Sequence, residues 1–314
     1  MTLAAAEVER FARDLAALAP SGKTGIAVSG GPDSLALLLL ANAARPGQIE
    51  AATVDHQLRE GSADEAATVA KLCEGLGIPH TILPVTVGLG ASLQAHARDA
   101  RYAALAAWGT AHNLTAIATA HHADDQAETL LMRLARGAGL SGLAGVRAAR
   151  ALSDGVTLIR PLLGWRKSEL EAIVAQAGLT PADDPANRDP RHDRTRARAF
   201  LARGDWPDPR QLAASASHLA DAEDALRFAT DHLANRLSGD SSGLALNAAD
   251  LPRELQRRLL LTAITRLGDS PPRGPDLDRA LTILDSGGAC TLGTLSLRAR
   301  DDRWQLAPAP PRRG

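Results

Sequence analysis

Six consecutive residues at 29–34, Ser-Gly-Gly-Pro-Asp-Ser, combine two adjacent glycines with two hydroxyls and a carboxylate. They follow an apolar stretch at 24–28 that is typical of a buried strand, and they precede an apolar helical stretch at 35–41. Adjacent glycines let several backbone N–H groups converge on one anion at the positive end of a helix, and Asp33 can hold Mg²⁺ beside bound phosphates. The residues expected to bind a nucleotide here are Ser29, Gly30, Gly31, Pro32, Asp33 and Ser34.

A second group of ionisable side chains lies at 121–129, His-His-Ala-Asp-Asp-Gln-Ala-Glu-Thr. The spacing of His121, Asp125 and Glu128 is that of one face of a helix. Such a face can bind Mg²⁺, hold a cationic amine or accept a proton from it. The alternative is an acidic first turn that complements the helix dipole, and the sequence leaves both interpretations open.

Arginines dominate two further stretches. Residues 98–102, Arg-Asp-Ala-Arg-Tyr, form either a charged surface turn or part of a substrate wall that includes Arg101. Between residues 188 and 198, five arginines and two aspartates give a local excess of three positive charges. That stretch is either a solvated loop or a surface that contacts RNA phosphates. The arginines expected to contact RNA are Arg188, Arg194, Arg196 and Arg198.

Strands that alternate with helices must position these groups. Strands are expected at 24–28, 49–54, 80–85, 115–119 and 156–159. Helices are expected at 7–18, 35–41, 63–76, 92–112 and 167–177. Ser62 and Glu65 have the spacing of a capping box at the start of one of them. The alternation predicts an α/β domain with a parallel sheet, whose ligands bind outside the carboxyl ends of the strands. We therefore expect the loop 29–34, the pair Asp55-His56 and the segment from His121 to meet there.

The alternation stops at a stretch with two prolines, residues 204–209. We expect an α/β domain at 1–204 and a smaller, mainly helical domain at 205–314. In the second domain the sequence predicts helices at 211–237, 251–267 and 277–284 and a hairpin at 295–306 with Asp301-Asp302 at its turn. Residues 181–198, rich in Pro, Asp and Arg, are expected to form a loop region.

Composition narrows the class of protein. A hydrophobic content of 45% and a net charge of −1 indicate a globular protein without a global positive field, so RNA binding must depend on local patches. No apolar run reaches the roughly 18–20 residues that span a bilayer, and residues 7–14 lack the order of a signal peptide. We therefore expect a cytoplasmic protein without a membrane partner. Cys73 and Cys290 form no CxxC, which argues against a cysteine-bound metal or cluster.

Residues 29–34 resemble the PP-loop of the N-type ATP pyrophosphatases, which split ATP between its α and β phosphates. Within that superfamily the chain closely resembles the tRNA(Ile)-lysidine synthetases. The matching segments are 29–34, 54–59 with Ser62 and 65–66, 97–102, 121–129 continuing to 142–143, 160–163, and 184–187 followed by Asp189 and 194–198. The resemblance implies a parallel-sheet PP-loop ATP pyrophosphatase domain followed by a smaller, mainly helical C-terminal domain that binds tRNA.

The resemblance also implies a reaction. Family members use ATP to adenylate the C2 oxygen of the wobble cytidine in an isoleucine tRNA, and the ε-amine of free lysine then displaces AMP to leave lysidine. We expect Asp33 and Asp125 to hold Mg²⁺, and Asp55 and His56 to bind ATP with the loop. Lysine arrives as an ammonium and must lose a proton, for which acidic side chains are suited. The expected catalytic residues are Asp33, Asp125, Glu128, His121 and Arg101.

Three positions depart from the family pattern. Thr195 stands where asparagine is usual, Ala197 where a larger aliphatic residue is usual, and His192 where an aromatic residue is common. These departures concern tRNA contacts rather than the reaction. Two alternatives remain: a tRNA cytidine 2-thiolase, against which the lack of CxxC counts, and a catalytically silent, nucleotide-dependent RNA-binding protein. The sequence leaves open whether the chain acts alone or as a homodimer.

Overall fold

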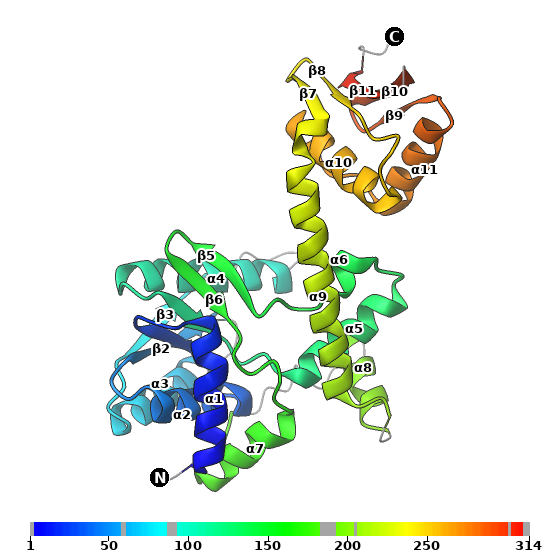
Figure 1. Ribbon diagram of the computed structural model, residues 1–314. Helices are drawn as coiled ribbons and strands as arrows, with labels where there is room; N and C mark the ends of the chain where they lie inside the picture. The colour runs from blue at the N-terminus through cyan, green and yellow to red at the C-terminus, as the bar shows by residue number, and fades with distance from the viewer. Residues whose placement is uncertain are drawn as a thin grey trace. The chain divides into compact units, whose positions relative to one another are not determined.

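The computed structural model describes residues 3–57, 61–86, 93–182, 193–203, 206–300 and 303–309. The chain forms two compact units, residues 1–220 and 221–314 (Figure 1). The division lies inside helix α9 (Pro209–His232), whereas the sequence predicts a boundary between residues 204 and 205. The long helix therefore contributes residues to both units.

The N-terminal unit is built on a six-stranded sheet of order β3-β2-β1-β4-β6-β5 (Figure 1). Its strands are β1 (Thr24–Ala27), β2 (Ile49–Asp55), β3 (His80–Pro84), β4 (Ala116–Ala118), β5 (Ala149–Ser153) and β6 (Val156–Ile159). All neighbouring pairs are parallel except β5 and β6, which form an antiparallel hairpin that the sequence did not predict. The predicted α/β fold with a parallel sheet is thus confirmed. Because β1 lies between β2 and β4, the carboxyl ends of these three strands share one edge.

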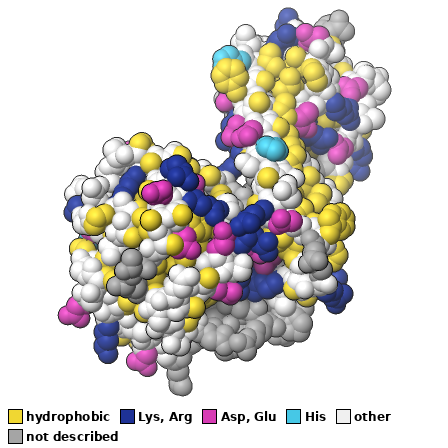
Figure 2. Space-filling view, turned by 60° about the horizontal axis from the view of Figure 1, so that its bottom comes forward, with side chains coloured by type: hydrophobic (Ala, Val, Ile, Leu, Met, Phe, Trp, Pro, Cys, Tyr) yellow, Lys and Arg dark blue, Asp and Glu magenta, His cyan; other side chains and the backbone are white. Residues whose placement is uncertain are grey.

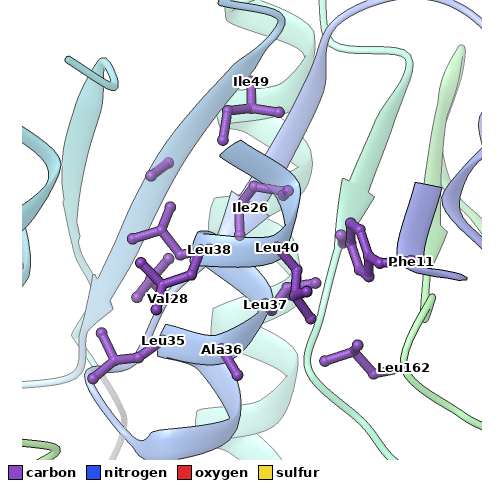
Figure 3. Packing of buried hydrophobic residues seen from close by; sticks show 14 of the residues in the cluster. Phe11, Ile26, Val28, Leu35, Ala36, Leu37, Leu38, Leu40, Ile49 and Leu162 are labelled. Atoms are coloured by element: carbon purple, nitrogen blue, oxygen red, sulfur yellow. The ribbon is translucent and has the colours of Figure 1, made fainter. Parts of the chain in front are cut away.

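Four helices pack on one face of this sheet: α1 (Ala5–Leu18), α2 (Pro32–Ala44), α3 (Ser62–Gly75) and α7 (Lys167–Gln176). Helix α2 is buried on all sides between the strands and helices α1 and α7, which explains its continuous apolar sequence. Figure 3 shows Leu37 and Leu40 on the side of α2 that faces Phe11, and Leu38 on the side nearer Val28. The helix that follows the glycine loop is therefore held rigidly in the core.

Helix α4 (Leu93–Ala111) covers the opposite face of the sheet. Its side chains Tyr102, Leu105 and Trp108 pack on residues of β1, β2, β4 and β6. A Cβ atom at Gly25 of β1 would lie 2.6 Å from Trp108, so only glycine lets the indole ring approach this strand. The remaining helices of the unit are α5 (Ala123–Ala135), α6 (Leu140–Leu143), α8 (Asp193–Leu201) and the first half of α9.

Two local predictions are wrong. Helix α3 begins at Ser62 itself, and its N-cap is Gly61, whose φ of 94° is left-handed and which has no side chain to form the cap. The capping box of Ser62 and Glu65 is therefore not formed. The predicted loop at 181–198 is helical from Asp193 onward, because α8 is rich in arginine, a good helix former, and is tied to α5 by ion pairs. Residues 183–192 lie outside the described part of the chain.

The C-terminal unit combines the end of α9 with α10 (Arg253–Arg266), α11 (Gly274–Asp285) and a five-stranded antiparallel sheet of order β7-β8-β11-β10-β9. The strands are β7 (Leu237–Asp240), β8 (Gly243–Leu246), β9 (Ala289–Leu292), β10 (Leu295–Arg300) and β11 (Arg303–Pro308). The predicted hairpin is confirmed as β10 and β11, while its turn at Asp301-Asp302 lies outside the described residues. The other three strands were not predicted. Every helix in the described ranges is too short or too polar to span a bilayer.

Candidate active site

The loop between β1 and α2 has the geometry of an anion site. Gly30 has a φ of +83°, a conformation that favours glycine, and Pro32 opens α2, where its fixed φ suits a helix start. The Ser34 hydroxyl donates to the Gly31 carbonyl at 2.9 Å and accepts from the Ser29 amide at 3.1 Å, so it holds the loop in shape. Gly31 is the N-cap and has no side chain, which leaves the first amides of α2 uncapped by any side chain at that position.

A cavity of about 250 Å³ opens beside this loop. From the loop it is lined by Ser29, Gly31, Asp33 and Ser34. His56 after β2 and His121 after β4 line it from the strand ends, and Arg101, Asp125 and Arg194 line it from helices α4, α5 and α8. The structure therefore brings together the segments that follow the parallel strands. It adds Arg194, which the sequence assigned to RNA contacts instead.

His122 links the carboxylates of Asp33 and Asp125. Its Nε2 lies 3.5 Å from Oδ2 of Asp33 and 3.5 Å from Oδ2 of Asp125. His122 is 3% exposed and is also the N-cap of α5, since its Nδ1 accepts from the Asp125 amide at 3.4 Å. With Nδ1 as acceptor, the proton of the neutral ring is on Nε2, between the two carboxylates. No role is predicted for His122 from the sequence, although its position between a strand end and an acidic helix is a signal that could have indicated one.

The neighbouring acidic residue, Asp124, has a structural role. Its Oδ2 accepts from the backbone N–H of Lys167 at 2.8 Å, which caps α7, and both of its carboxylate oxygens accept from Arg166 Nε at 3.2 Å. Burial by itself raises the pKa of Asp124, but the bonds from Arg166 and Lys167 hold it below its ordinary value. Of the two adjacent aspartates, therefore, Asp125 is the one that lines the cavity.

His121 lies in strongly basic surroundings. Burial, followed by the charges of Arg160, Arg101, Arg194 and Arg98, lowers the pKa of His121 to about 3. The residue precedes α5, which begins at Ala123, so the prediction that it shares a helix face with Asp125 and Glu128 is wrong. A neutral imidazole with so low a pKa is a poor acceptor for a proton from an amine.

Glu128 is buried and paired with two arginines. Its side chain is 3% exposed and accepts from Arg194 Nε at 2.9 Å and from Arg198 Nε at 2.8 Å. The hydrogen bond from Arg198 raises the pKa of that guanidinium, although burial acts against it. Arg196 differs, because its side chain is 78% exposed and its ion-pair partner is Asp193, at 3.7 Å on the same helix. Two of the arginines predicted to contact RNA thus join α8 to α5.

Several predicted residues lie outside the cavity lining. Gly30, Pro32, Asp55 and Glu128 do not line it, and Arg188 is outside the described residues. The Asp55 carboxylate is buried and accepts from the Gln57 amide at 2.9 Å, in a turn where Gln57 has a φ of 52°. Asp55 therefore shapes the turn that carries His56 into the cavity wall.

The cavity fits a nucleotide phosphate with Mg²⁺. Oδ1 of Asp33 and Nδ1 of His56 are buried without a hydrogen-bond partner among the described residues, a costly arrangement that a bound ligand would relieve. A Cβ atom at Gly31 would meet only Ser29 Oγ, at 3.7 Å, so a side chain there would enter the cavity. The described residues contain no group of three His, Cys, Asp or Glu suited to a metal, and Mg²⁺ commonly shares one or two carboxylates with substrate phosphates.

Known proteins resemble this chain in sequence and fold. Residues 3–204 match the family described as PP-loop domain. The tRNA(Ile)-lysidine synthase of Novosphingobium aromaticivorans is 50% identical over 307 residues, which cover 97% of this chain and 94% of that protein. The corresponding protein of Zymomonas mobilis subsp. mobilis is 42% identical over 299 residues, covering 93% and 90%. A U34-tRNA thiolase from Methanococcus maripaludis has a TM-score of 0.57 at 18% identity over 68% of this chain and 79% of its own, which shows a shared fold.

Proposed function

Because the chain belongs to the tRNA(Ile)-lysidine synthase family of PP-loop proteins, we propose that it uses ATP to join free lysine to C2 of the wobble cytidine of an isoleucine tRNA. The substrate would be the tRNA with a CAU anticodon, and the product lysidine would change its codon and amino-acid identity. The main observation that supports this proposal is that one cavity is lined by residues of the phosphate loop, which include Asp33, and by Asp125 and Arg101.

In the proposed first step, the C2 oxygen of cytidine attacks the α-phosphate of ATP and pyrophosphate leaves. The loop amides and the N-terminus of α2 would bind the departing phosphates, because their N–H groups are fixed before the reaction. Arg101, at the cavity wall, would stabilise the charge that develops on the α-phosphate. Asp33 and Asp125 would hold Mg²⁺, which neutralises phosphate charge when bound.

In the proposed second step, the ε-amine of lysine attacks C2, a carbon–nitrogen bond forms and AMP leaves with the former C2 oxygen. The amine must first lose a proton, and Asp125 is the carboxylate that lines the cavity. Glu128 lies about one helical turn further along α5, where two guanidinium groups neutralise it. For Glu128 to bind the lysine ammonium, that cation would replace one of the guanidinium groups as the partner of the carboxylate.

The positions of the two cysteines argue against the alternative reaction, sulfur transfer. Cys73 is fully buried in the core of the N-terminal unit, and burial raises its pKa to about 11, so its thiolate form is scarce at neutral pH. Cys290 belongs to the C-terminal unit, and neither cysteine lines the cavity. These observations support amine transfer over thiolation.

The experiment that tests the proposal is nucleoside analysis of isoleucine tRNA after incubation with the protein, ATP and lysine. We expect lysidine at the wobble position, together with AMP and pyrophosphate in equal amounts. Release of ADP, or modified tRNA without lysine, would contradict the proposal. A protein without tRNA-dependent exchange between ATP and pyrophosphate would instead be the silent RNA-binding alternative.

A further inference from the structure

Four arginines surround the single tyrosine of the chain. The Tyr102 ring is 9% exposed, and the guanidinium carbons of Arg98, Arg101 and Arg150 lie 5.1, 5.7 and 4.6 Å from its centroid. Arg160, which follows β6 and is 2% exposed, lies near the Tyr102 side chain, since burial raises the pKa of Tyr102 and the charge of Arg160 helps to lower it. Nη1 of Arg160 donates to the Arg147 carbonyl at 2.5 Å. The three distances to the ring centroid lie within the range of a cation–π contact. We call Arg98, Arg101, Arg150 and Arg160 the arginine cluster.

The arginine cluster has no carboxylate partner among the described residues. Burial and the neighbouring arginines lower the pKa of Arg101 and of Arg160, and Tyr102 acts in the opposite direction. Nε of Arg160 is buried without a hydrogen-bond partner within the same described ranges. Like charges held together without a counter-ion destabilise a folded protein, so this arrangement indicates a binding site for an anion from outside.

Other arginines of the protein have internal partners. Figure 2 shows Lys and Arg side chains gathered on the displayed face of the N-terminal unit, with Asp and Glu side chains among them. The paired arginines include Arg194 and Arg198 with Glu128, Arg253 with Asp285, Arg257 with Asp278, and Arg258 with Glu223. An external anion would have to displace these carboxylates, whereas within the described part of the chain it meets none in the arginine cluster.

The position of the arginine cluster favours RNA over the phosphates of ATP. Arg150 lies on β5 and Arg160 follows β6, and β6 is two strands from β1 in the sheet, about 10 Å at the usual strand spacing. The phosphates of ATP already have a loop of their own after β1. Arg101 lines the cavity, whereas Arg98 and Arg150 are exposed. The cluster thus extends from the cavity wall to the surface.

We propose that Arg98 and Arg150, the exposed members of the arginine cluster, bind the phosphodiester backbone of the RNA substrate beside the nucleotide that enters the cavity. This inference rests on the proposed function, since it names the surface on which that tRNA is held. Arg98 and Arg150 would contact the phosphates, because a guanidinium can donate two parallel hydrogen bonds to a phosphate group. The buried side chains of Arg160 and Tyr102 would position the guanidinium groups of Arg98 and Arg150.

The test is the salt dependence of tRNA binding by the Arg98→Gln/Arg150→Gln double variant. Both side chains are exposed, so the variant is expected to fold. If each arginine contacts one phosphate, the affinity for isoleucine tRNA falls and the slope of log K against log salt flattens by about 1.4–1.8. The Arg98→Lys/Arg150→Lys variant keeps the charge and should keep most of the slope. Arg13→Gln is the matched control, because Arg13 is exposed on α1, across the sheet from α4.

Two results would overturn the inference: an unchanged salt slope in the folded double variant, or weaker binding of ATP in the absence of RNA, which would assign the cluster to ATP phosphates. Nucleoside analysis of the unmodified protein separates this inference from the proposed function. Lysidine formation with an unchanged slope would contradict only the RNA site. A flattened slope without lysidine formation would support the RNA site and contradict the reaction.

Discussion

His121 and His122 are consecutive in the chain but lie in opposite electrostatic surroundings. Burial and the guanidinium groups near His121, that of Arg160 first, lower its pKa to about 3. Burial acts in the same direction on His122, but the hydrogen bond to Asp33 and the charges of Asp125, Asp33 and Asp124 raise its pKa above the ordinary value. The site thus has a basic side around His121 and an acidic side around His122, and these two residues are joined by a single peptide bond. The first suits phosphate groups, and the second suits a cation.

In the nucleotide-free protein, we expect His121 to stay neutral well below its ordinary pKa of 6.5. Because its pKa is lower in the folded state, protonation favours unfolding: this contribution to stability is present above pH 6.5 and is lost as the pH falls toward 3. NMR titration of the imidazole resonances tests the prediction. His121→Gln should flatten the fall of the unfolding free energy over that range. A His121 resonance that titrates near pH 6.5 would contradict it.

Asp33→Ala should abolish ATP cleavage in a folded protein. Among the described residues, its Oδ1 atom has no hydrogen-bond partner and its Oδ2 atom has a single ion-pair contact, to His122 Nε2 at 3.5 Å, so the variant loses little internal bonding. We expect tRNA-dependent exchange between ATP and pyrophosphate to fall by about two to three orders of magnitude, as for the loss of a fixed electrostatic contact to a transition state. Circular dichroism checks the fold. Near-native exchange by the variant would mean that Asp33 does not face the phosphates.

Gly31→Val should block nucleotide binding without disturbing the core. The nearest described atom to a Cβ at this position is Ser29 Oγ at 3.7 Å, so the larger side chain enters the cavity rather than the protein interior. Equilibrium binding of ATP measures the effect. Gly75→Val is the control, because a Cβ there has nothing within 4 Å and Gly75 does not line the cavity. If both variants bind ATP equally well, the phosphates lie elsewhere.

Glu128→Gln removes the charge that binds Arg194 and Arg198. We expect the free energy of unfolding to fall by about 1–2 kcal/mol, since two charge-assisted hydrogen bonds to half-exposed guanidinium groups are weakened. If Glu128 also binds lysine, the KM for lysine should rise more than the KM for ATP, with adenylated tRNA still formed. Denaturant unfolding and the two KM values test this, with the exposed Glu171→Gln as control. Equal loss of both half-reactions would point to a role with the metal.

Replacing Arg194, Arg196 and Arg198 with alanine should flatten the salt slope of tRNA binding by only about one unit. Only Arg196 is largely exposed, while the other two are bound to Glu128. The triple variant should also be less stable, because it leaves Glu128 buried without these partners. Filter binding over a range of salt concentrations and thermal unfolding measure both effects. A change of two to three units would mean that Arg194 and Arg198 leave Glu128 when RNA binds.

Most of the N-terminal fold follows from local patterns in the sequence. Apolar strands that alternate with helices predict the parallel sheet, because such strands can be joined only through crossover helices. The register of β1 between β2 and β4 then brings residues 29–34, His56 and His121 to one edge. Local patterns failed where long-range contacts stabilise a segment. Helix α8 is held by Glu128, which is 66 residues away from Arg194 along the chain, and three strands of the C-terminal sheet were too short to stand out.

The glycine turn at 29–34 and the helix that follows it can be predicted from the sequence alone, since glycine conformation and helix polarity are local properties of the backbone. Which charged side chains face one another depends on the tertiary structure. Asp124 caps α7 while Asp125 lines the cavity, and Glu128 binds Arg194 and Arg198. These choices depend on the direction of each side chain and on neighbours far away in the chain. The sequence shows which side chains are charged, but tertiary packing sets the partner of each charge. Among the described residues it gives the arginine cluster around Tyr102 no carboxylate partner.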